Sequence, residues 1–206
     1  MSLSALKRTT GAALAAALLL WSASGASADT GVRVRGTVVS LSEDTLVVKS
    51  REGSEVTVKL TKGWVVGGLT QASLADIKPG DFVGVASLPK AQGGDEALEV
   101  LVFPPAMKGT GEGSFGWDLK PESTMTNGSV SEAVKSVDGA TLNVTYHGQS
   151  KQITVDPGTP IVTFTPASVA DVKPGAPVFV PSQKADDGTL SAGRVMVGKN
   201  GVVPPM

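Results

Sequence analysis

The chain has 206 residues, no cysteine, one histidine and a formal net charge of −1. The absence of cysteine excludes disulfides, thiolate metal sites, cysteine nucleophiles and a lipidated cysteine anchor, and a single histidine excludes a multi-histidine metal site. With 25 glycines and 13 prolines, the composition favours a turn-rich β protein, and a hydrophobic fraction of 41% is enough for a packed core.

The first 28 residues have the pattern of a signal peptide. Lys7 and Arg8 give a positively charged start, and residues 11–21 form an apolar run. Ala26-Ser27-Ala28 then matches the small-residue cleavage motif, so we predict a cut after Ala28 and a periplasmic or secreted protein. An uncleaved membrane anchor is the alternative. The apolar run is too short to cross a hydrocarbon core of about 30 Å as a helix. We therefore predict no transmembrane segment in the mature chain.

The rest of the chain contains two copies of one unit. Residues 72–80 (ASLADIKPG) recur as residues 167–175 (ASVADVKPG), with seven of nine positions identical at an offset of 95. The offset holds to the end of each copy, which is the signature of an internal repeat. The predicted division is copy one at residues 29–104, a glycine-rich linker at 105–127 and copy two at 128–206.

Each copy has the pattern of three meandering strands, a short helix and a closing hairpin. Short β-branched runs with period two are separated by tight-turn residues. In copy two, Thr165 and Pro166 predict a helix start, and Lys173-Pro174-Gly175 predicts its end. In copy one, residues 70–77 are predicted to form the equivalent short helix. The predicted strands of copy one are residues 32–41, 45–49, 55–60, 81–87 and 97–103, and copy two has turns at Asp138-Gly139 and His147-Gly148 before strands at 177–181 and 190–197.

This order is that of a five-stranded OB barrel, in which a helix lies between strands three and four. We therefore predict an all-β protein of two tandem five-stranded OB-like β-barrels, each with one short helix between strands three and four. An immunoglobulin-like sandwich is the alternative, but it needs about seven strands.

Three segments of copy two, residues 134–144, 167–175 and 187–195, resemble a bacterial exported family catalogued as domain of unknown function 5666. The resemblance covers both copies and implies an OB-like fold with no assigned chemistry. Relatives of this tandem form sometimes carry a metal-transporter permease label. That label does not fit a chain without several spanning segments.

The linker carries the candidate site. Its glycines at 111, 113 and 116 match a dinucleotide-binding pattern, but no strand leads directly into them and no helix follows, so we interpret them as linker flexibility. A wholly flexible linker has no need for large aromatics such as Phe115 and Trp117. We expect these residues either to pack between the barrels and fix the angle between them or, with Asp118, to line a ligand site at the domain junction.

Catalytic and metal-binding groups are sparse in the sequence. His147 falls at a predicted hairpin turn, and no nucleophile elbow accompanies it. Acidic pairs such as Asp95-Glu96 fall at predicted turns, where they serve the backbone, although weak calcium binding at one of them stays open. We predict no catalytic residue, no cofactor and no metal site.

In predicted strands two and three of copy one, alternation places Leu46, Val48, Val56 and Val58 toward the core. The outward faces of these strands then carry no aromatic residue, and neither do those of copy two. Removal of the signal peptide also takes away two of the 18 basic residues and leaves a net charge of −3. Both features argue against a nucleic-acid partner.

We predict a non-enzymatic binding or adaptor protein whose partner is an envelope protein or a glycan. One alternative is an accessory to metal uptake, which the label on relatives alone suggests. The other is a glycan-acting enzyme that uses two carboxylates about 5–10 Å apart in a cleft.

Overall fold

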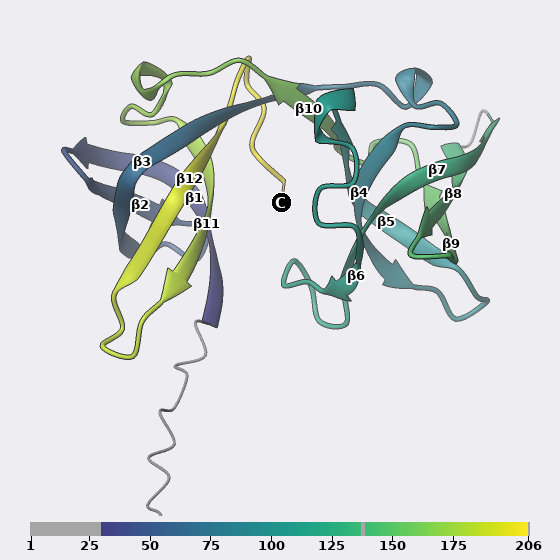
Figure 1. Cartoon of the computed structure of the whole chain (residues 1–206), viewed down its shortest axis with the longest axis horizontal. Coiled ribbons are helices and arrows are strands. Elements are labelled where there is room, and N and C mark those ends of the chain that lie inside the picture. Colours follow the sequence, from purple (N-terminus) through teal and green to yellow (C-terminus); the bar gives the residue numbers. More distant parts are fainter. Residues whose placement is uncertain (1–29, 137–138, 206) are drawn as a thin grey trace, which may run out of the picture.

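The computed structural model describes residues 30–136 and 139–205, so the predicted signal peptide and Asp138 of a predicted turn lie outside the described residues. Within these residues the protein is all-β, with twelve strands and three single 3₁₀ turns (Figure 1). The strands are β1 (Thr30–Ser42), β2 (Thr45–Ser50), β3 (Glu55–Gln71), β4 (Phe82–Pro89), β5 (Asp95–Phe103), β6 (Gly113–Gly116), β7 (Thr124–Ser136), β8 (Gly139–Tyr146), β9 (Gln149–Val155), β10 (Ile161–Thr165), β11 (Pro177–Lys184) and β12 (Leu190–Gly198), and the 3₁₀ turns are η1 (Leu74–Asp76), η2 (Pro105–Met107) and η3 (Val169–Asp171).

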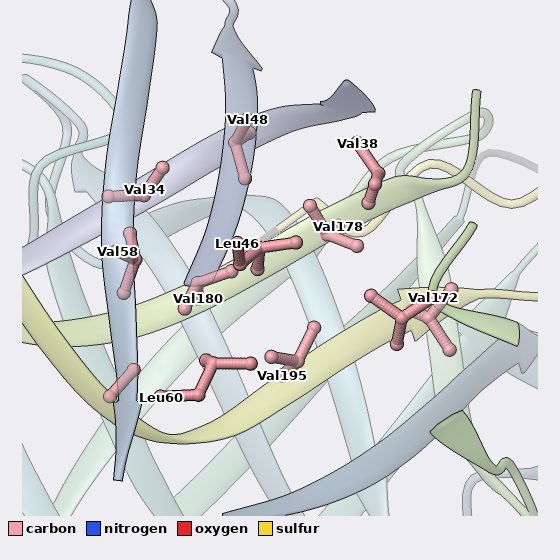
Figure 2. Packing of buried hydrophobic residues seen from close by; sticks show 12 residues of the cluster. Val34, Val38, Leu46, Val48, Val58, Leu60, Val172, Val178, Val180 and Val195 are labelled. Carbon is pink, nitrogen blue, oxygen red and sulfur yellow. The ribbon is translucent and has the colours of Figure 1, made fainter. Parts of the chain in front are cut away.

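Five strands form a closed barrel in the order β12–β11–β1–β2–β3, with β3 pairing back to β12. Alternation along each strand sends one set of aliphatic side chains inside, as Figure 2 shows. Of the four residues predicted to face this core, Leu46, Val48 and Val58 are fully buried, and Val56 is partly buried and packs against them. Val172, which follows η3, is buried in the same core.

A second unit of five strands has the order β5–β4–β7–β8–β9. A short parallel pairing joins β5 to β9, with Asp95 opposite Ile153 and Glu96 opposite Thr154. Its core again consists of alternating aliphatic side chains. Ile77, which follows η1, is buried in it and matches Val172 at the offset of 95.

The two copies exchange their last two strands. The barrel takes β1–β3 from copy one and β11–β12 from copy two, and the second unit takes β7–β9 from copy two and β4–β5 from copy one. The strand pairing therefore does not follow the predicted division into a barrel at 29–104 and another at 128–206. The reason lies in β3, which runs for 17 residues where the sequence predicts a strand at 55–60. It carries the chain out of the barrel and delivers the next hairpin to the other unit (Figure 1).

Strands β3 and β10 join the two units, and β10 also pairs in parallel with β5. Their antiparallel register places Leu69 opposite Phe164, two positions that are equivalent at the offset of 95. The neighbouring pair Gly68–Thr165 maps onto the pair Thr163–Thr70 in the same way. The exchange is therefore reciprocal, with an approximate two-fold axis at the Leu69–Phe164 pair.

The predicted short helices are single 3₁₀ turns. Each is closed by a capping box, from Ser73 and Asp76 in η1 and from Ser168 and Asp171 in η3. The predicted cap at Thr165 is wrong, because that residue ends β10. Since Lys-Pro-Gly follows each turn within a few residues, proline blocks further helical growth.

The units are held together by a third apolar cluster. Leu69, Leu101, Val162, Phe179 and Met196 are buried in it and come from strands of both units. No helix in the described part of the chain is long and apolar enough to cross a membrane.

Candidate ligand site at the junction

The segment predicted as a linker, residues 105–127, is ordered as η2, β6 and the start of β7. Strand β6 pairs with β7, so that Phe115 lies opposite Met125. Gly111 and Gly113 have φ angles of 59° and 142°, which side chains rarely adopt. These two glycines therefore allow the backbone turns around β6. Their sequence pattern, by contrast, predicts linker flexibility.

Trp117 lies at the junction and contacts the opposite unit. The guanidinium of Arg33, from β1 of the barrel, stacks 3.8 Å from the centre of the Trp117 ring. Phe115 meets the same indole edge-on at 6.1 Å and is itself 41% exposed. Trp117 also packs against the third apolar cluster. Of the two predicted roles, packing between units is therefore observed for Trp117, while a ligand contact stays a prediction.

Asp118 forms ion pairs with the same strand of the barrel. Its Oδ1 is 2.6 Å from Arg35 Nη2 and 3.7 Å from Arg33 Nη1. Burial acts to raise the pKa of Asp118, but the hydrogen bond from Arg35 and the charges of both arginines outweigh it and hold the pKa below its ordinary value. Asp118 is therefore a carboxylate that fastens β1 to the segment after β6.

Glu99, in the middle of β5, is the functional candidate that sequence reasoning missed. Its side chain is 1% exposed, and neither carboxyl oxygen has a hydrogen-bond partner in the described structure. It points to the junction, because Leu101, two residues on and hence on the same face of the strand, belongs to the third cluster.

Burial raises the pKa of Glu99 to about 8. The positive charges of Arg35 and Arg51 act against this rise, and the negative charge of Asp118 adds to it. The side chain is therefore mostly a neutral acid at pH 7, with one O–H donor and free acceptor capacity. A buried polar group without a partner costs on the order of 1–3 kcal/mol, so it calls for an explanation.

The repeat shows that the fold does not need a buried acid at this position. The residue equivalent to Glu99 at the offset of 95 is Arg194, which is exposed on β12. One sequence signal could have pointed to Glu99. Both copies have a charged residue at this place within an otherwise apolar stretch of strand. The pattern did not show that one would be buried and the other exposed, because the junction covers only one of them.

A cavity of about 380 Å³ adjoins Glu99. Both units contribute to its wall, and so does the C-terminal segment that enters the space between them (Figure 1). Arg51, in the turn after β2, donates a hydrogen bond of 2.6 Å from Nη2 to the backbone carbonyl of Pro204 and so anchors that segment. The lining residues are Arg51, Leu98, Glu99, Leu119, Lys120, Pro160, Val203 and Pro205.

A second unpartnered polar group lies at the same junction. The Nε1 of Trp117 is buried and has no hydrogen-bond acceptor among the described residues. The candidate site thus combines a small cavity, a neutral buried acid and the cationic side chains of Arg51 and Lys120, and the unpaired indole N–H lies at the same junction but outside the cavity lining. Apolar clefts with a few convergent polar groups are the usual form of small-molecule sites.

Other predicted residues lie away from the junction. His147 is exposed in the β8–β9 turn with a φ of 45°, which confirms the predicted hairpin turn. Asp95 begins β5 and does not lie in a turn. Its Oδ2 is 2.8 Å from Lys151 Nζ and accepts a 2.6 Å hydrogen bond from Ser87. Within residues 30–136 and 139–205, no three His, Asp or Glu side chains gather closely enough to hold a metal ion.

A scan against protein-family models and searches of curated proteins and of solved structures found no match. The resemblance to the exported family therefore stays a prediction.

Proposed function

We propose that the protein is an exported, non-enzymatic binding or adaptor protein that holds a ligand in the cavity beside Glu99. The observation that carries the proposal is the buried carboxyl of Glu99, which has no hydrogen-bond partner among the described residues and belongs to a residue that lines the cavity between the units. A bound molecule would supply the hydrogen bonds that the fold leaves unmade. Export rests on the signal-peptide pattern of the first 28 residues.

The architecture supports a binding role. We interpret the exchanged strands as two OB-like barrels, one closed and the other with its ends joined by β5 and β9. The site lies where they meet, a common place for ligand pockets. Leu101, on the same face of β5 as Glu99, is buried in the third cluster, so the strand that carries Glu99 is held in place at the junction.

The ionisation states and partners of the two acids at the junction, Asp118 and Glu99, favour binding over catalysis. A carboxylate-based enzyme needs an ionised partner free to act on a substrate. Asp118 is ionised, but Arg33 and Arg35 hold it. Glu99 is neutral and therefore suited to donate a hydrogen bond to a ligand.

The test is a fragment library screened against the purified protein by ligand-detected NMR. We expect fragments that bind the wild type and are displaced when Leu98→Trp fills the cavity. Val65→Trp is the control, because Val65 is 52% exposed and lines a different part of the surface. If Leu98→Trp does not fold, Lys120→Glu changes the charge of the same wall. Absence of any bound fragment, or binding that no cavity variant alters, would contradict the proposal.

A further inference from the structure

The charges around Glu99 are mainly positive. Arg51 and Lys120 line the cavity with it, and Arg35 is close enough to act on its ionisation. The negative group that acts on Glu99 is Asp118, whose charge is neutralised by its ion pairs with Arg35 and Arg33. Glu52 does not line the cavity and acts on Arg51. With Glu99 protonated, the described lining residues therefore carry two positive charges, those of Arg51 and Lys120.

The rest of the wall is apolar. Leu98, Leu119, Pro160, Val203 and Pro205 surround the polar groups. A ligand that fits this wall has an apolar body and one polar head. A head with a negative charge is favoured by Arg51 and Lys120, whereas an ammonium head is repelled by both.

From this arrangement we infer that the cavity takes a small carboxylate with an apolar body, whose oxygens accept a hydrogen bond from the buried Glu99 carboxyl and face Arg51 and Lys120. The inference rests on the proposed binding function and names the ligand class for the same site. A carboxylic acid that donates to a carboxylate makes a charge-assisted hydrogen bond, which is stronger than one between neutral groups. Such a bond satisfies the Glu99 carboxyl, which has no partner among the described residues.

The experiment is calorimetric titration of the full chain with hexanoate, hexan-1-ol and hexylamine, which share a six-carbon body and differ in the head group. At pH 6.5 we expect hexanoate to bind at least about tenfold more tightly than either of the others. At pH 9.5 Glu99 has lost its proton and repels the carboxylate, so the affinity for hexanoate falls by about tenfold or more. Equal or tighter binding of the alcohol or the amine, or an affinity for hexanoate that does not change with pH, would overturn the inference.

Variants test whether Glu99, and not another titratable group, causes the pH dependence of hexanoate binding. Glu99→Gln keeps a hydrogen-bond donor and cannot ionise, so it should bind hexanoate with the same affinity at both pH values. Arg51→Gln should weaken binding at least about tenfold. Arg194→Gln, at the equivalent position of the repeat, should leave the affinity unchanged. A pH dependence that persists in Glu99→Gln would also overturn the inference.

The outcomes distinguish the inference from the proposed function. If hexanoate does not bind but the NMR screen detects other fragments whose binding the Leu98→Trp substitution abolishes, the ligand class is wrong and the binding site stands. If no fragment binds and hexanoate also fails, both are wrong.

Discussion

A buried acid makes protein stability depend on pH. The pKa of Glu99 rises from an ordinary 4.5 to about 8 because burial disfavours the charged form. The folded state therefore holds the proton more tightly than the unfolded state does. The stability linked to this group is fully present below about pH 4.5 and is lost as the pH rises through about 8.

Glu99→Gln removes this dependence because glutamine has no proton to lose. Relative to the wild type, we expect the variant to gain roughly 4 kcal/mol in free energy of unfolding between pH 5 and pH 9. Urea unfolding at both pH values measures the change. Glu96→Gln, on the exposed face of the same strand, is the matched control. Its free energy of unfolding should change with pH as that of the wild type does. A Glu99→Gln curve parallel to the wild type would contradict the burial of an unpaired acid.

Trp117 stabilises the junction through its ring, while its N–H group is buried without a partner. Trp117→Phe keeps an aromatic face for Arg33 and removes the unpaired donor, so the free energy of unfolding should change by less than about 1 kcal/mol. Trp117→Ala removes the ring and should cost about 2 kcal/mol, below the usual range for a fully buried Trp because the side chain is half-buried. Equal losses in both variants, measured by urea unfolding, would show that the N–H group has a partner.

At the level of elements, the pairing of β5 with β9 joins copy one to copy two. A polar network holds this seam, in which Lys151 on β9 contacts both Asp95 on β5 and the hydroxyl of Thr124 on β7. Asp95 is 7% exposed and also accepts from Ser87 on β4. A charge pair in such a place is costly to break, because the remaining charge, on Lys151, is largely shielded from water with its side chain 21% exposed.

Asp95→Ala should therefore lower the free energy of unfolding by about 3 kcal/mol, since Lys151 is left without its counter-charge. Asp44→Ala is the matched control, because it removes an equivalent pair with Lys59 that lies exposed at the surface. We expect no measurable change from the control. Equal losses in the two variants, measured by urea unfolding, would place the Asp95–Lys151 pair in solvent.

The sequence predicts elements better than it predicts their partners. Strand identity and inward faces follow from alternation, so Leu46, Val48 and Val58 were predictable as core. The hairpins β4–β5 and β11–β12 follow the same Lys-Pro-Gly motif and have similar patterns. Either hairpin is therefore suited to complete either meander, and local pattern does not choose between them. The length of β3 decides, and the strand continues past residue 60 because its second half pairs with β10 and β12.

For the whole molecule, the exchange creates the candidate site. Because each unit contains strands from both copies, the chain crosses the junction at β3 and β10, and the C-terminal segment returns to it. The sequence pointed to the junction through Phe115, Trp117 and Asp118, which the structure does place there. It did not point to Glu99 or Arg51, because their proximity depends on which hairpin completes which unit.

Two engineered disulfides test the exchange of strands most directly, in a chain that has no cysteine of its own. In the structure Gly31 on β1 lies opposite Gln183 on β11. If each copy formed its own barrel, β1 would instead face β4, and Gly31 would lie opposite Leu88, the residue equivalent to Gln183 at the offset of 95.

We expect Gly31→Cys with Gln183→Cys to form a disulfide within one chain on mild oxidation, because facing residues of an antiparallel pair meet the distance requirement. Gly31→Cys with Leu88→Cys should stay reduced. Peptide mass spectrometry of the oxidised monomer reads out both pairs. A disulfide between positions 31 and 88, with none between 31 and 183, would contradict the exchange.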